Sequence, residues 1–134
     1  MISNYNQESL RDVIKKYRQL SLGNSNSFIN KVIQDIKKEF NTNDIRVKIH
    51  AIQKLFFLYL NFRDIKWASF NSLDIMSTCG MKGKLFGYLL SSLQFKTQED
   101  FILLVSNQIR SDLHKTNLNS NGLLYLLIKN NFLF

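Results

Sequence analysis

The sequence predicts an all-α fold built from stacked helical hairpins, and three observations support this. Proline is absent and glycine occurs only five times in 134 residues, so asparagine, serine and aspartate provide most of the breaks. Long segments carry apolar residues at helical spacing, and no alternating strand pattern of comparable length competes with them. The predicted helices pair into units of about 35 residues, a period typical of helical-hairpin repeats.

The first two predicted helices each have one apolar face. They run from about Ser9 to Leu20 and from about Ser27 to Phe40, with a polar loop between them. The side chains expected to point inward are Leu10, Val13, Ile14, Tyr17, Leu20, Ile29, Val32, Ile33, Ile36 and Phe40. Lys31, Lys37 and Lys38 fall on the outer face of the second helix and are expected in solvent.

The third predicted helix, residues 44–62, is the element around which the others are expected to pack. Apolar side chains fill well over half of its helical wheel, namely Ile45, Val47, Ile49, Ala51, Ile52, Leu55, Phe56, Leu58, Tyr59, Leu60 and Phe62. A helix that is apolar over so wide an arc needs neighbours on at least two sides. Its longest apolar run, Leu55–Leu60, is far shorter than the roughly 20 residues of a membrane span. We therefore expect this helix inside the stack, capped by the polar residues 41–44.

Further helices bring the predicted total to about seven. The fourth covers about Trp67–Thr78 and stops at Gly80, because glycine readily adopts the left-handed conformation that ends a helix. The fifth covers about 82–95, and Thr97 with Asp100 forms a capping pattern that opens a sixth helix. The sixth helix is expected to bury Phe101, Leu104, Val105, Ile109 and Leu113.

The last predicted helix, about 122–131, is apolar on nearly all sides. Solenoids need a polar capping helix at each end, and none follows this one. We therefore expect residues 1–134 to form a single domain that is either the front end of a longer helical-repeat solenoid or one that buries this end against a partner.

Composition and charge narrow the classes of function. Hydrophobic residues make up 45% of the chain, and 18 Lys and Arg against 10 Asp and Glu give a formal net charge of +8. This charge favours nucleic acid, an acidic protein or phospholipid headgroups as partner, although a compositional bias toward lysine gives the same number. A single cysteine, Cys79, allows no internal disulfide, and the polar amino terminus lacks the apolar core of a secretion signal. The sequence therefore predicts a cytosolic protein whose membrane contact is peripheral.

Little in the sequence indicates catalysis. His50 and His114 lie on separate elements without partners at metal-ligand spacing. The segment GMKGK at 80–84 has too few residues between its glycines, and a leucine after its second lysine, to be a phosphate-binding loop. We predict a protein that is not an enzyme and needs no metal or cofactor.

A group of basic residues surrounds the junction of the second and third helices. Arg46, His50 and Lys54 follow one another at four-residue intervals, so the solvent face of the third helix is expected to be basic. The candidate site for an anionic membrane headgroup is Lys37, Lys38, Arg46, Lys48, His50 and Lys54. The alternative is an ordinary solvated face.

Four short motifs follow one another along the chain. They are Lys48 with Lys54-Leu55, the run Asp64–Ser77 (DIKWASFNSLDIMS), Gly87–Leu89 (GYL) and Asn107–Leu113 (NQIRSDL). In this order and spacing they resemble the delta-type large subunit (delta-adaptin) of adaptor protein complex three, over about residues 9–128. Three positions depart from that family, which usually has a turn glycine, an arginine and a small residue where this chain has Phe62, Leu85 and Leu124.

The resemblance implies a right-handed, armadillo- or HEAT-like α-α superhelix that serves as a scaffold of a vesicle adaptor coat in intracellular protein transport. Because the large subunits of that family are far longer, it also implies that residues 1–134 are the amino-terminal fragment of an adaptin-type helical-repeat trunk. The implied partners are a sigma-type small subunit, a beta-type large subunit, a medium subunit, an Arf-type GTPase and the anionic surface of Golgi or endosomal membranes, where the protein would be peripheral on the cytoplasmic side. Related large subunits bind phosphoinositides through cations that correspond by position to Lys48, His50 and Lys54, with Lys37 and Lys38 as neighbours.

Two alternatives stay open. The first is a basic helical repeat that binds nucleic acid or another acidic partner, although the coat interpretation does not expect nucleic acid. The second is a protein-interaction solenoid unrelated to coats.

Overall fold

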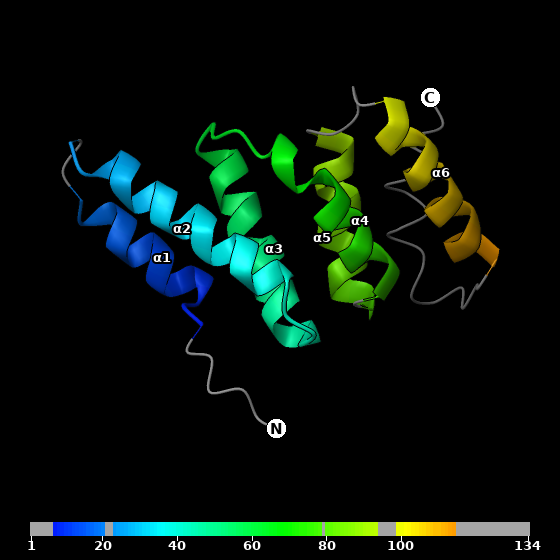
Figure 1. Ribbon diagram of the computed structural model, residues 1–134, viewed down its shortest axis with the longest axis horizontal. Coiled ribbons are helices and arrows are strands. Elements are labelled where there is room, and N and C mark those ends of the chain that lie inside the picture. Colours follow the sequence, from blue (N-terminus) through cyan, green and yellow to red (C-terminus); the bar gives the residue numbers. More distant parts are fainter. Residues whose placement is uncertain (1–6, 21–22, 79, 94–98, 115–134) are drawn as a thin grey trace.

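The computed structural model describes residues 7–20, 23–78, 80–93 and 99–114 of the chain. All regular structure within these ranges is helical (Figure 1), which confirms the predicted all-α fold. The helices are α1 (Leu10–Arg18), α2 (Ser25–Phe40), α3 (Ile45–Leu60), the short 3-10 helix η1 (Lys66–Ala68), α4 (Ser69–Thr78), α5 (Gly80–Leu93) and α6 (Glu99–His114). The helix expected at 122–131, with Leu124, lies outside the described residues, as do Thr97 and the predicted end of the fifth helix.

The helices are stacked along the long axis of the molecule (Figure 1), and three pairs of alternate helices in the described part of the chain pack against one another. Thus α3 packs against both α1 and α5, while α4 packs against α6. Consecutive helices pack as well, with α2 on α3 and α4 on α5. This is the arrangement of a helical-hairpin solenoid. With α1, α2, α4 and α5 all in contact with it, α3 occupies the interior position that the sequence predicted.

Short polar side chains and one glycine define several helix ends. The Ser9 hydroxyl accepts a hydrogen bond from the backbone N–H of Asp12 at 3.2 Å, which caps α1. The Asp44 carboxylate accepts from the backbone N–H of Arg46 at 2.9 Å and caps α3, so the predicted cap is confirmed. Gly80 has a φ of +67°, which confirms its predicted left-handed conformation between α4 and α5.

The burial of α3 follows the prediction in its middle and departs from it at its ends. The fully buried side chains of its central turns are Ala51, Ile52, Leu55 and Leu58. Ile45, Leu60 and Phe62 are exposed, so their predicted burial is wrong. The first two lie in the end turns of α3 and Phe62 lies beyond it, where the neighbouring helices no longer cover the apolar arc. Leu104 of α6 was also expected in the core and is exposed instead.

The turn after α3 is a Schellman motif with Phe62 at its left-handed position. The N–H of Phe62 donates to the carbonyl of Tyr59, and the N–H of Arg63 donates to the carbonyl of Leu58, each at 3.0 Å. The φ of Phe62 is +60°, a conformation that costs a residue other than glycine about 1–2 kcal/mol. Backbone hydrogen bonds hold this turn, and the departure from the expected glycine adds strain to it.

Close packing explains the Gly-Tyr-Leu motif of α5. A Cβ atom on Gly87 would lie 2.1 Å from Cγ of Met76 and 3.2 Å from the carbonyl oxygen of Ser72, both on α4. Any side chain at residue 87 would therefore push α5 away from α4. The next residue, Tyr88, is buried and donates a hydrogen bond to the carboxylate of Asp112 in the NQIRSDL motif. Two of the four motifs therefore meet where α5 faces α6.

Candidate functional site

Four of the six predicted cations are exposed on one edge of the helical stack, where α2 ends and α3 begins. Lys37 and Lys38 lie in the last turn of α2, and Arg46 and His50 lie in the first two turns of α3. The short connection between α2 and α3 brings these turns together on the same edge of the molecule (Figure 1). We call these four side chains the basic end. An anion approaching this end meets several positive charges at once.

An aromatic contact positions one of these cations. The Nζ atom of Lys37 lies 4.9 Å from the ring centroid of Trp67, which is a cation–π contact. The indole N–H of Trp67 donates to the carbonyl of Asp64 at 3.2 Å, so the ring is held by the first residue of the DIKWAS run. This contact orients the Lys37 ammonium group without neutralising its charge, and the cation remains available to an anion.

Lys48 is engaged within the molecule. Its Nζ atom lies 3.0 Å from Oδ2 of Asp74 on α4. The Lys48 side chain is mostly buried, whereas that of Asp74 is about half exposed. Because a carboxylate already offsets its charge, Lys48 attracts an external anion less strongly than the basic end does.

The structure contradicts the predicted solvent position of Lys54. Its side chain is 1% exposed, and its Nζ atom lies 2.6 Å from Oε1 of Glu39, which is also 1% exposed. The cause is the inward position of Glu39 on α2, three residues after the buried Ile36, on the side where α2 covers α3. Lys54 thus forms a buried ion pair and cannot reach a headgroup outside the protein.

A second cluster of buried polar side chains, which the sequence analysis did not predict, is centred on Asp112. Its Oδ1 accepts hydrogen bonds from Nζ of Lys84 at 2.6 Å and from Nε2 of Gln108 at 3.0 Å, and its Oδ2 accepts from the hydroxyl of Tyr88. The Lys84 ammonium group also donates to the carbonyl of Met76 at 2.8 Å. Burial, together with the hydrogen bond to Asp112 and its negative charge, raises the pKa of Tyr88 above its ordinary value, so the hydroxyl stays protonated and donates. The cluster ties α4, α5 and α6 together.

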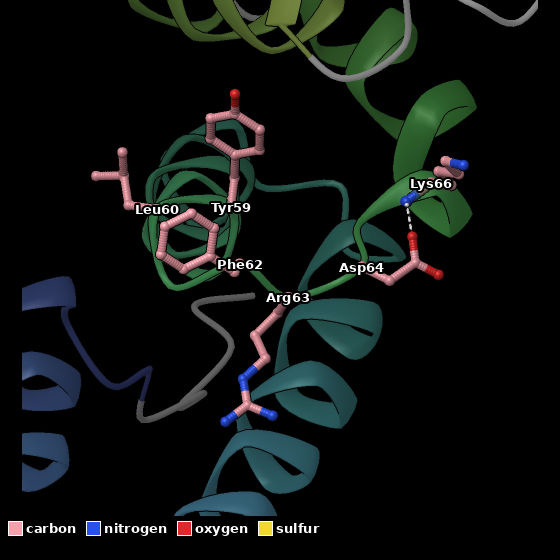
Figure 2. Close-up of a pocket in the computed structure, with 6 residues that line it drawn as sticks. All are labelled: Tyr59, Leu60, Phe62, Arg63, Asp64 and Lys66. Carbon is pink, nitrogen blue, oxygen red and sulfur yellow. Dashed lines mark hydrogen bonds between the residues drawn. The ribbon is translucent and has the colours of Figure 1, made fainter.

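A pocket at the far end of α3 was also missed from the sequence. It has a volume of about 640 Å³ and is lined by Tyr59, Leu60, Phe62, Arg63, Asp64 and Lys66 (Figure 2). Helical periodicity assigned Leu60 and Phe62 to the core, although Leu60 is 57% exposed and Phe62 is 99% exposed. The signal that could have found the pocket is the position of Phe62 next to Asn61, a residue type that often ends helices.

The described residues contain no group of His, Cys, Asp and Glu side chains that could hold a metal ion. His50 is exposed on α3, and the side chain of His114 lies outside the described ones. In the same part of the chain, every helix is too short or too polar to cross a membrane.

Comparison with known proteins finds one family model and several relatives that share one name. Residues 25–123 match the family described as the adaptin N terminal region. The AP-3 complex subunit delta of Arabidopsis thaliana is 35% identical over 118 residues, which cover 87% of this chain and 14% of the relative. The AP-3 complex subunit delta-1 of Bos taurus is 36% identical over 79% of this chain and 9% of its own length. The corresponding protein of Dictyostelium discoideum is 36% identical over 83% of this chain and 10% of its own length. The matched region is therefore a small part of each of these proteins.

Proposed function

This chain belongs to the adaptin N terminal region family, and from that membership we propose that it forms part of the scaffold of a vesicle adaptor coat. The role is non-enzymatic and serves intracellular protein transport. The partners we infer are a sigma-type small subunit, a beta-type large subunit and a medium subunit, together with an Arf-type GTPase. The names of the relatives, AP-3 complex subunit delta, support this proposal. So does an elongated helical stack, which offers large outer surfaces for partner subunits.

The basic end is proposed to meet anionic headgroups on the cytoplasmic side of Golgi or endosomal membranes. The observation that carries this proposal is the clustering of exposed Lys37, Lys38, Arg46 and His50 on the edge of the stack where α2 ends and α3 begins. This group is smaller than the predicted one because Lys54 is buried against Glu39. Each Lys or Arg near an anionic membrane surface contributes about 1 kcal/mol to the free energy of binding.

Co-expression with the sigma-type small subunit of adaptor complex three tests the scaffold role. We expect the two chains to co-elute in equal amounts on size-exclusion chromatography. A scaffold interface that buries on the order of 1,000 Å² or more of surface is stable enough to survive the column. Each chain alone provides the reference elution volume. Separate elution of the two chains after co-expression would contradict the scaffold proposal.

Reversing the charge of the basic end should abolish most vesicle binding. The variant Lys37→Glu/Lys38→Glu/Arg46→Glu is expected to bind phosphoinositide-containing vesicles about 100-fold more weakly than wild type, since three favourable contacts are lost. Sedimentation with the vesicles measures the bound fraction. Wild-type binding should also weaken as salt rises, because exposed charges are screened beyond about 8 Å at physiological ionic strength.

A control variant with the same change in net charge separates a local site from general attraction. Arg11→Glu/Lys15→Glu/Lys31→Glu replaces three exposed cations of α1 and α2 outside the basic end. We expect it to retain vesicle binding within a few-fold. Equal loss in both variants would show that only net charge matters and would remove the site. A steep, salt-dependent affinity for RNA without affinity for vesicles would instead favour the nucleic-acid alternative.

A further inference from the structure

Phe62 has a position that folding alone does not explain. It is 99% exposed, so its ring gains nothing from burial in the core, and it holds the left-handed conformation that glycine or asparagine adopts with less strain. The Schellman hydrogen bonds of the turn involve only backbone atoms of residues 58–63. The turn would therefore form without an aromatic side chain at residue 62. A strained and exposed aromatic residue of this kind is a candidate contact for a partner.

The surroundings of Phe62 add an apolar wall and positive charge. Leu60 is also exposed and lines the same pocket, and Figure 2 shows the Phe62 ring over the end of α3. The guanidinium group of Arg63 donates to the side-chain oxygen of Asn26 at 3.0 Å. Within the described part of the chain, neither Arg63 nor Lys66 forms an ion pair. The Asp64 carboxylate, the acid of the pocket, accepts a hydrogen bond from the backbone N–H of Lys66 at 3.0 Å.

The location of the pocket distinguishes a protein partner from a membrane. The pocket follows the last turn of α3, whereas Arg46 and His50 of the basic end lie in its first turns. The 16-residue helix α3 is about 24 Å long, and the basic end and the pocket lie at its opposite ends. A flat bilayer lying across the first turns of α3, at the basic end, would therefore not reach Phe62 beyond its last turn. Apolar surface next to unpaired cations fits an acidic polypeptide segment.

We propose that the Phe62 pocket binds a short acidic segment of another protein. An apolar side chain of that segment packs against Phe62 and Leu60, and its carboxylates pair with Arg63 and Lys66. The side chain of Phe62 serves as the anchor, in keeping with the large share of binding energy that aromatic residues contribute at interfaces. This binding does not depend on the adaptor role or on the basic end.

The substitution Phe62→Asn tests the proposal because it separates stability from binding. The probes are short synthetic peptides that carry several glutamates and one phenylalanine or leucine, and their binding to the full chain is followed by fluorescence anisotropy. We expect wild type to bind them and Phe62→Asn to bind at least about tenfold more weakly. The Tm of the variant should be unchanged or up to about 4 °C higher, since asparagine tolerates the left-handed conformation. Lys66→Glu should also weaken binding, whereas Lys31→Glu on α2 should not.

Controls make the outcomes decisive. Leu103→Asn removes another exposed apolar side chain, on α6, and should leave peptide affinity unchanged. Peptides with lysine in place of glutamate should not bind. Failure of wild type to bind any acidic peptide of the set would overturn the proposal, and so would equal binding by wild type and Phe62→Asn. Loss of anionic vesicle binding in Phe62→Asn would overturn it as well, because the pocket would then face a membrane.

Discussion

Replacing Lys54 with methionine should lower the free energy of unfolding by about 3–5 kcal/mol. The substitution keeps an unbranched side chain of similar length but removes the ammonium group 2.6 Å from Glu39. The Glu39 carboxylate then stays buried without a counter-charge, and its Oε2 atom already has no hydrogen-bond partner among the described residues. Such a loss is a large share of the roughly 5–15 kcal/mol that stabilises a typical domain. Urea denaturation followed by circular dichroism measures it.

Two comparisons identify burial as the cause. Lys48→Met removes the other ion-paired lysine of α3, but its partner Asp74 is about half exposed, so we expect a loss of at most about 1 kcal/mol. The double variant Glu39→Leu/Lys54→Met removes both charges and should recover most of the stability, because apolar side chains can replace a buried ion pair. If Lys54→Met cost no more than Lys48→Met, the buried pair would be refuted.

The sequence predicted the helices well because their boundaries depend on local chemistry. Asp44 caps α3 and Gly80 takes the left-handed conformation between α4 and α5, and both effects act within a few residues. The buried middle of α3 follows from helical periodicity. The exposure at its carboxyl end does not follow from periodicity. Whether Leu60 and Phe62 are buried depends on where the neighbouring helices end.

The candidate site was predicted less completely because it depends on contacts between helices. Lys37, Lys38, Arg46 and His50 are exposed, in agreement with their spacing. The burial of Lys54 could have been anticipated only by noticing that an acid lies on the inward face of the preceding helix, at Glu39. When an acid on one helix and a base on the next both lie on the inward, apolar faces, they indicate a buried ion pair rather than a surface cluster. A single helical wheel does not show such a pair, because its two side chains belong to different helices.

The same pattern recurs in α6, where Asp112 follows the buried Ile109 by three residues, and it leads to a second large effect. Asp112→Ala should lower the free energy of unfolding by about 3 kcal/mol. It removes the acceptor of three hydrogen bonds and leaves the buried hydroxyl of Tyr88 without that partner. The Lys84 ammonium group keeps its bond to the carbonyl of Met76, which limits the loss. Chemical denaturation of the variant measures the change.

A matched control lies in the same helix. Asp100 is an exposed acid in the first turn of α6, so Asp100→Ala should cost at most about 1 kcal/mol through the helix dipole. The double variant Tyr88→Phe/Asp112→Ala should be less destabilised than the sum of its single variants, because removing the hydroxyl also removes the unsatisfied donor. Additive losses would mean that Tyr88 and Asp112 act independently, and the contact between the two motifs would then have no energetic role. A coupling of about 1 kcal/mol or more would instead show that this contact helps to hold α5 and α6 in register.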